Sequence, residues 1–279
     1  MELITTIPAI KTYVKGIKQR GETICLVPTM GYLHKGHLDL MRMGKTLADH
    51  LVISIFVNPT QFGLGEDLAK YPRDIPRDLS LLETVKTDFV FIPSAGDMYP
   101  LVYNTWVDVE KVTERLEGAS RPGHFRGVAT VCNKLFNIVQ PTKAYFGQKD
   151  AQQVVAIKKM VADLNMNLEI VAVPTMREPD GLAMSSRNTY LNPKERQAGV
   201  VLYKALTLAQ KLYTSGEQDA EKIRQEMIKL IQKEPLASID YVSIANAETL
   251  EEQDKITPPA VVSMAVRIGK TRLIDNVTL

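Results

Sequence analysis

Ile24-Cys-Leu-Val27, a short apolar run, leads into Pro28-Thr-Met-Gly-Tyr-Leu-His-Lys-Gly-His37 and then into a stretch with a helical pattern. An apolar run, a glycine-containing turn and a helix in this order are typical of a parallel α/β sheet. In such sheets, ligands bind beyond the carboxyl ends of the strands, where residues 28–37 fall. The unpaired N–H groups and the dipole of the helix start favour an anion at this position.

His34 and His37 are three residues apart, so both imidazoles can face the same side of a helix start. Gly36 lacks the Cβ that would keep a phosphate away from the backbone. Two such rings can hydrogen-bond phosphate oxygens and stabilise charge that builds up on phosphorus. The alternatives are a metal site, for which no nearby Cys, Asp or Glu cluster supplies further ligands, and a surface histidine. The strand–turn–helix context favours the phosphate site.

Further short apolar runs predict buried parallel strands with helices between them. The predicted strands are residues 24–27, 51–57, 88–92 and 168–173, with another short strand ending at Gly147. The predicted helices are residues 38–50, 76–86, 128–139 and 152–164. This alternation predicts an α/β fold with a Rossmann-like, doubly wound parallel sheet.

The composition of the chain changes near residue 190. Two charged amphipathic helices are predicted at residues 194–211 and 219–233, followed by a solvated loop at 249–259. Three short strands are predicted at residues 240–245, 261–268 and 271–277. We therefore expect a smaller C-terminal α+β domain, with its boundary between residues 176 and 191.

Composition excludes several classes of protein. The chain has 279 residues, of which 45% are hydrophobic and 24% charged, as in an ordinary globular protein. Its 34 basic and 32 acidic residues give a net charge of +2 without a long basic run, which argues against a nucleic-acid binder. Cys25 and Cys132 have no disulfide or metal-ligand spacing. The first residues lack a signal peptide's apolar stretch and no run reaches the ~20 apolar residues of a membrane span, so we expect a cytoplasmic protein.

Two common nucleotide-binding signatures are absent. Gly-Lys-Thr occurs at residues 44–46 and 269–271, but a P-loop requires a glycine five residues earlier, where Asp39 and Met264 stand. Gly63-Leu64-Gly65 lacks the third glycine and the strand-to-helix placement of a dinucleotide-binding turn.

Three more polar segments have chemistry suited to a site. Gln61, after the second predicted strand, offers an amide to a hydroxy acid, although Asn58-Pro59 before it is equally consistent with an ordinary turn. Lys149 suits a phosphate and Asp150 a ribose hydroxyl, although Asp150 could instead cap a helix. Residues 176–187 supply two hydroxyls and a guanidinium, on a mobile lid or on an ordinary polar linker.

Together these segments resemble the pantoate–β-alanine ligase (pantothenate synthetase) family of the HIGH-motif nucleotidyltransferase superfamily. The matching segments are residues 28–37, 56–62, 121–127, 146–153 and 180–187, which follow one another across the chain. The resemblance implies ATP-dependent condensation of pantoate with β-alanine to pantothenate. The first step would form pantoyl-adenylate and release pyrophosphate, and the second would release AMP.

The resemblance also implies roles for individual residues. His37, His34 and Lys149 would be catalytic, with His37 as the proton donor, and Gln61 and Gln153 would hold pantoate. The residues implied in ATP binding are Met30, Gly31, His34, Gly36, His37, Gly147, Gln148, Lys149, Asp150, Met176, Met184, Ser185, Ser186 and Arg187. Residues 1–180 would bind ATP and pantoate, and residues 181–279 would form a lid. The family further implies Mg²⁺ on the phosphates, with unassigned protein ligands, and a homodimer.

Three alternatives have distinct signatures. A nucleotidyltransferase that joins AMP to a phosphate-bearing substrate predicts an additional basic pocket in place of the neutral Gln61 and Gln153. An aminoacyl-tRNA synthetase predicts an anticodon-binding domain and more positive charge. A non-catalytic nucleotide sensor predicts altered catalytic positions, whereas His34, His37, Lys149 and Arg187 are all present.

Overall fold

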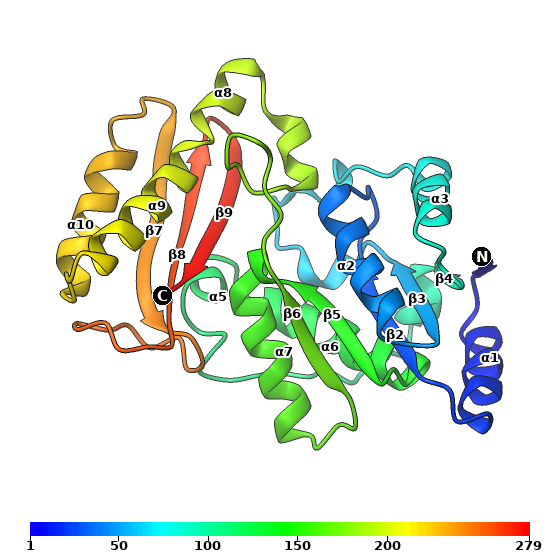
Figure 1. The fold of residues 1–279 in the computed structure, drawn as a ribbon. Helices are drawn as coiled ribbons and strands as arrows, with labels where there is room; N and C mark the ends of the chain where they lie inside the picture. Colours follow the sequence, from blue (N-terminus) through cyan, green and yellow to red (C-terminus); the bar gives the residue numbers. More distant parts are fainter.

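The computed structural model describes residues 1–279 and contains two β-sheets (Figure 1). The larger is a six-stranded parallel sheet with the order β1-β4-β3-β2-β5-β6. Its strands are β1 (Glu2–Ile4), β2 (Ile24–Thr29), β3 (His50–Ile55), β4 (Phe89–Phe91), β5 (Lys143–Gly147) and β6 (Glu169–Val173). The predicted Rossmann-like sheet is confirmed.

Ten α-helices accompany the two sheets. They are α1 (Ile7–Gln19), α2 (Lys35–Thr46), α3 (Ile75–Thr84), α4 (Ala95–Met98), α5 (Glu117–Ser120), α6 (His124–Val139), α7 (Ala151–Asp163), α8 (Pro193–Ala198), α9 (Val201–Thr214) and α10 (Ala220–Ile231). The short 3₁₀ helices are η1 (Pro59–Gln61), η2 (Asp67–Ala69), η3 (Gln148–Asp150) and η4 (Ser186–Tyr190). No helix combines the length and apolar character needed to cross a bilayer.

Side chains of β2 alternate between the two faces of the parallel sheet. Ile24 and Leu26 join a hydrophobic cluster with α1, α6 and α7, whereas Cys25 and Val27 join a second cluster with α2 and α3. Burial on both faces explains why this strand is a continuous apolar run.

From β2 the chain adds β3 and β4 on one side of the sheet, whereas β6 is added on the other side, next to β5. The point between β2 and β5 is therefore a topological switch point. These two strands pair at Cys25–Lys143 and Leu26–Ala144, and β2 then continues to Thr29 beside β3. The loops that follow β2 and β5 leave the sheet on opposite sides of this point, which opens a crevice at the carboxyl edge.

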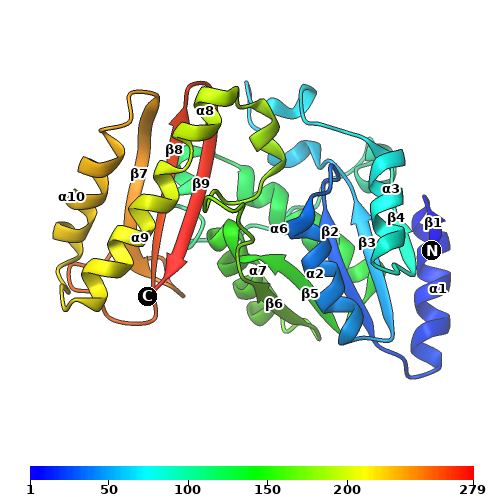
Figure 2. The same ribbon diagram turned by 45° about the horizontal axis from the view of Figure 1, so that its top comes forward.

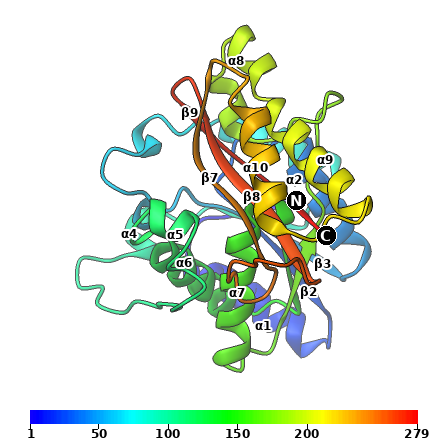
Figure 3. The same cartoon turned by 90° about the vertical axis from the view of Figure 1, so that its left-hand side faces the viewer.

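The smaller sheet is antiparallel and consists of β7 (Ala237–Asn246), β8 (Ala260–Ile268) and β9 (Thr271–Thr278). Helices α9 and α10 pack against it (Figures 1 and 3). Its side chains and those of both helices form a third hydrophobic cluster, which confirms the expected α+β unit.

Several predicted boundaries were wrong. The helix predicted at residues 38–50 is α2 (Lys35–Thr46), and His50 belongs to β3. The Asp49 carboxylate accepts hydrogen bonds from the Thr23 N–H and hydroxyl at 2.8 and 2.6 Å, which turns the chain into β3. The helix predicted from residue 128 begins at His124, because Gly123 at its N-cap adopts a positive φ of 80°.

Other differences concern short or interrupted elements. The single helix predicted at residues 194–211 is divided into α8 and α9 around Gly199. The sequence analysis missed β1, a three-residue edge strand, and α1, whose Ile10, Val14 and Ile17 form a buried helical stripe.

Candidate active site

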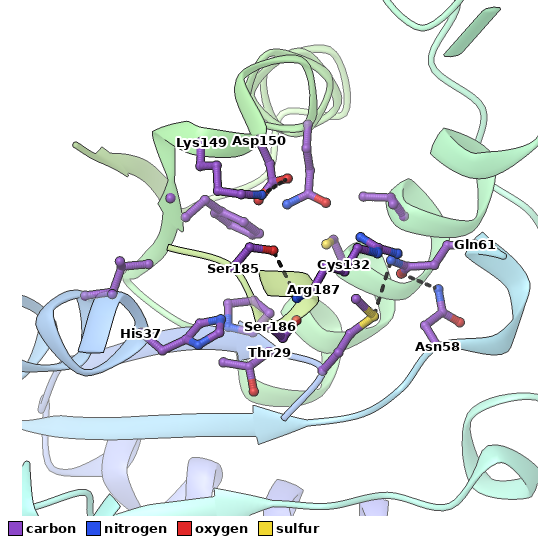
Figure 4. Close-up of a pocket in the computed structure, with 18 of the residues that line it drawn as sticks. Thr29, His37, Asn58, Gln61, Cys132, Lys149, Asp150, Ser185, Ser186 and Arg187 are labelled. Atoms are coloured by element: carbon purple, nitrogen blue, oxygen red, sulfur yellow. Dashed lines mark hydrogen bonds and ion pairs between the residues drawn. The ribbon is translucent and has the colours of Figure 1, made fainter. Parts of the chain in front are cut away.

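A cavity of about 230 Å³ lies at the carboxyl edge of the parallel sheet, between the loops that follow β2 and β5. Of the residues predicted to bind substrates, all but Gly31 and Gln148 line it. Figure 4 shows Lys149 and Asp150 at one side, Gln61 and Asn58 at another, and Ser185 and Arg187 between them. The predicted residues that line the cavity come from four parts of the sequence, namely residues 30–37, residue 61, residues 147–153 and residues 176–187.

The two predicted histidines stack on each other at the start of α2. Their ring centroids are 3.9 Å apart, and the His34 backbone N–H donates to His37 Nδ1 at 3.3 Å. Because Nδ1 accepts this bond, the proton of a neutral His37 ring is on Nε2. A Cβ on Gly36 would lie 3.1 Å from the His34 ring and 3.4 Å from Met176 Cβ, so glycine keeps this packing tight.

Burial keeps both rings neutral. Together with the nearby Lys149 ammonium, it lowers the pKa of His34 to about 4. Burial also lowers the pKa of His37 well below its ordinary value, with His34 and Lys149 acting in the same direction. Each ring is therefore a neutral hydrogen-bonding group. No third His, Cys, Asp or Glu joins them in a metal-binding group.

Asp78 holds the turn that presents the histidines, a role that the sequence analysis missed. This fully buried carboxylate on α3 accepts from the Tyr32 and Leu33 N–H groups, both at 2.7 Å. Gly31 and Tyr32 have positive φ values of 80° and 51°, so the turn needs such an anchor. Gly31 therefore shapes the turn from outside the cavity lining.

Lys149 and Asp150 lie in η3, between β5 and α7. The Lys149 ammonium is 3.5 Å from the Asp150 carboxylate, and the two side chains are 20% and 44% exposed. Asp150 stands at the N-cap of α7, but its side chain makes no capping hydrogen bond. The carboxylate is therefore not used as a helix cap and faces the cavity.

Gln61 lies opposite, in a buried hydrogen-bond network. Its Oε1 accepts from Asn58 Nδ2 at 3.0 Å, and its backbone carbonyl accepts from His124 Nδ1 at 2.8 Å. Burial, reinforced by the Arg121 guanidinium, lowers the pKa of His124 to about 4. Asn58 Oδ1 also accepts from the Thr60 N–H at 3.4 Å. Asn58 therefore stabilises the turn, as its sequence context suggested, and also holds the Gln61 side chain.

Arg121 and His124 line the cavity but were not assigned a role from the sequence. Arg121 donates to both Glu66 oxygens at 2.8 and 2.6 Å and contacts His124 Nε2 at 3.1 Å. Both residues lie in segment 121–127, one of the segments that resemble the family, and this position could have indicated a role in the site. Because Arg121 is neutralised by Glu66, this side of the cavity carries no free basic pocket.

Arg187 and Ser186 cover the cavity from the loop after β6. Arg187 donates to both Asp67 oxygens at 2.9 Å, which leaves its Nη1 without a partner in the chain. Burial opposes ionisation of Asp67, but the hydrogen bonds and the positive charge of Arg187, with smaller contributions from other hydrogen bonds, together lower the pKa of Asp67. Tyr71, also missed from the sequence, lies 3.2 Å from the Ser186 hydroxyl.

Comparison with known proteins identifies the family. The family model described as pantoate-beta-alanine ligase matches residues 2–278. The pantothenate synthetase of Acetivibrio thermocellus is 57% identical over 277 residues, 99% of each chain, and that of Pelotomaculum thermopropionicum is 56% identical over 279 residues, 100% of this chain and 99% of the relative.

Solved structures agree with this result. The pantothenate synthetase of Thermus thermophilus superimposes with a TM-score of 0.95, 42% identity and 99% coverage of both chains. The pantoate-beta-alanine ligase of Francisella tularensis, complexed with beta-gamma ATP and beta-alanine, superimposes with a TM-score of 0.82 and 34% identity over 100% of this chain and 97% of its own. The chain therefore belongs to the pantoate–β-alanine ligase family.

Proposed function

We propose that this protein condenses pantoate with β-alanine to form pantothenate, through a pantoyl-adenylate intermediate. The observation that carries the proposal is the single cavity whose lining includes His34, His37, Lys149 and Arg187 together with the neutral amides of Gln61 and Gln153. The lining thus offers cationic and neutral donors to a triphosphate and amides to a hydroxy acid. The Francisella complex with beta-gamma ATP and beta-alanine supports the same assignment.

In the first step, a carboxylate oxygen of pantoate attacks the α-phosphorus of ATP. The new P–O bond forms as the bond to the β-phosphate oxygen breaks, and pyrophosphate leaves with its electron pair. Lys149 and the His37 Nε2–H stabilise the charge that gathers on the phosphates. Alignment of the two reactants in one cavity supplies ~7 kcal/mol or more of the barrier reduction.

In the second step, the amine of β-alanine attacks the acyl carbon. The C–N bond forms as the bond from that carbon to the phosphate oxygen breaks, AMP leaves with the electron pair, and the amine nitrogen releases a proton to solvent. The mixed anhydride is reactive toward water, so the cover formed by Ser185, Ser186 and Arg187 has a second function. Burial holds the pKa of His37 well below its ordinary value, which favours hydrogen bonding to phosphate over transfer of an extra proton.

Mg²⁺ is part of the proposal as a partner of the ATP phosphates. Asp150 is the one carboxylate that lines the cavity. Mg²⁺ commonly binds through one or two carboxylates, substrate phosphates and water, so Asp150 fits such a site. The bound ion would neutralise phosphate charge.

We also propose a lid formed by residues 181–279, separate from a binding domain of residues 1–180, and a cytoplasmic homodimer. Support for the lid is the separate hydrophobic cluster around β7–β9. Limited proteolysis should cut first near residue 180 if the division holds, and ATP should protect that position. Sedimentation tests the dimer, and cell fractionation tests the location.

The decisive experiment measures pyrophosphate release with ATP and Mg²⁺, first with pantoate alone and then with added β-alanine. We expect pantoate-dependent release that becomes sustained with β-alanine, together with AMP and pantothenate. ATP binding without pantoate-dependent release would refute the substrate assignment. Formation of an AMP-linked product without any amine would favour the alternative nucleotidyltransferase.

A further inference from the structure

Two neighbouring residues of β9 hold two walls of the cavity without lining it. Asp275 and Asn276 pair with Met264 and Ser263 of β8 and are only 2% and 4% exposed. Asn276 bonds to the η3 turn, and Asp275 bonds to the loop that follows β6. We propose that Asn276, supported by Asp275, is a positioning residue that fixes Lys149 for adenylate formation, an inference that rests on the proposed function.

Asn276 uses its full donor capacity on the η3 turn. Its Nδ2 donates to the Gln148 carbonyl at 2.9 Å and to the Lys149 carbonyl at 2.8 Å. A side-chain amide has two N–H groups, so each hydrogen serves one carbonyl. Two successive peptide planes are thereby held, and they set the direction in which the Lys149 side chain leaves the backbone.

The carbonyl oxygen of the Asn276 side chain shows that filling space is not the only function of this residue. Asn276 Oδ1 is buried without a hydrogen-bond partner. A buried acceptor without a partner is unfavourable, and an apolar residue of the same shape would avoid it. The amide is therefore matched to the two carbonyls of η3 and to nothing else around it.

Asp275 extends the same support to the other wall. Its carboxylate accepts from Arg177 Nη1 and Nη2 at 2.6 and 3.0 Å, and from the Asn276 N–H at 2.8 Å. Arg177 also donates to the Gly181 carbonyl at 3.0 Å. Since Arg177 directly follows Met176, this ion pair anchors the base of the loop that covers the cavity.

The test compares Asn276→Leu, which keeps the side-chain size but removes both donors, with Tyr241→Phe as the control. Tyr241 donates a hydrogen bond to Glu117 at 3.0 Å, which joins β7 to α5 and involves no atom of η3. For Asn276→Leu we expect a fall of about 10- to 100-fold in kcat for pyrophosphate release, because small displacements of a catalytic group have effects of this size. The KM for pantoate should change less than about threefold.

Amide hydrogen exchange at residues 148–151, measured without substrates, separates this inference from the proposed function. Exchange should accelerate in Asn276→Leu and stay unchanged in Tyr241→Phe. Asn276→Gln, which restores an amide on a longer stem, should recover part of both losses. Should Asn276→Leu be too unstable to assay, Asn276→Ser, with one donor at most, carries the same expectations.

Wild-type kcat and wild-type exchange in Asn276→Leu would overturn the positioning role, as would equal losses in Tyr241→Phe. If wild-type protein releases no pyrophosphate, the proposed function fails, and the exchange data alone then decide whether Asn276 holds η3.

Discussion

The parallel and antiparallel sheets lie side by side, yet every residue that lines the cavity falls between positions 28 and 187, outside the antiparallel sheet (Figure 2). In a parallel sheet all carboxyl ends meet at one edge, so the loops after β2, β3, β5 and β6 converge there. In an antiparallel sheet the strand ends alternate, and no such convergence arises. The smaller sheet instead contributes through side chains such as Asn276 that hold parts of the other sheet's loops.

The largest effect is expected from Lys149→Ala, which tests the direct contribution of the parallel sheet. Loss of a charged donor to the phosphates should lower kcat for pyrophosphate release by about 10³-fold. The measurement is the pyrophosphate-release assay at saturating ATP. Lys159→Ala is the matched control, because Lys159 lies on α7 and pairs with Asp163 at 2.7 Å outside the cavity. Equal losses in both variants would contradict a specific role for Lys149.

His37→Ala should follow, with a fall of about 10²-fold in the same rate, because a neutral hydrogen-bond donor to phosphate is lost. Its thermal melt should stay near that of the wild type. His50→Ala is the control, since His50 contacts Glu22 at 2.7 Å and does not line the cavity. A collapse of the melt in His37→Ala would assign a structural role to this residue.

Arg272→Met tests a contact between β9 and α5 that lies outside the cavity lining. Arg272 donates to both oxygens of the buried Glu117 at 2.6 and 2.8 Å. Leaving that carboxylate unpaired should lower the free energy of unfolding by about 3 kcal/mol, as measured by urea denaturation. The double variant Glu117→Gln/Arg272→Met should regain part of this loss.

The control is Arg267→Met, because the Arg267 side chain is 50% exposed and lies 3.4 Å from Asp240. It should change the free energy of unfolding by less than about 0.5 kcal/mol. An equal loss in Arg267→Met and Arg272→Met would show that the buried pair of Arg272 and Glu117 contributes no more to the free energy of unfolding than an exposed pair does.

The smallest effect is a dependence of stability on pH through His124. Its folded-state pKa of about 4 lies below the ordinary value, so the folded protein excludes the proton that the unfolded chain takes up. The resulting stability is fully present above about pH 6.5 and declines as the pH falls toward 4, by about 2 kcal/mol at pH 5.

The measurement is the thermal melt between pH 4 and 8 for the wild type and for His124→Asn, whose amide can still donate to the Gln61 carbonyl. The variant should lose less stability on acidification. Parallel curves would show that His124 does not contribute to the acid sensitivity.

Local patterns in the sequence were sufficient for the sheet and for most of the cavity lining. Residues 24–27 are continuously apolar, which predicted a strand covered on both faces and placed the residues after it at the ligand-binding edge. The short edge strand β1 had too few residues to form a pattern, and the end of α2 depends on Asp49 bonding to Thr23, a residue distant in the sequence. The roles of individual cavity residues, and the domain division at residue 180, stay predictions.

The sequence by itself determined the class of fold and supplied the candidate site residues, because both follow from patterns that can be read along the chain. The tertiary structure decided how those side chains are held. Asp78 accepts from the turn before the histidines, Asp67 accepts from Arg187, and Asn276 donates to η3. Each of these residues is far along the chain from the group that it contacts. Their hydrogen bonds exist only once folding has brought the partners together and excluded water, and burial in the folded state likewise lowers the pKa of His34 and His37.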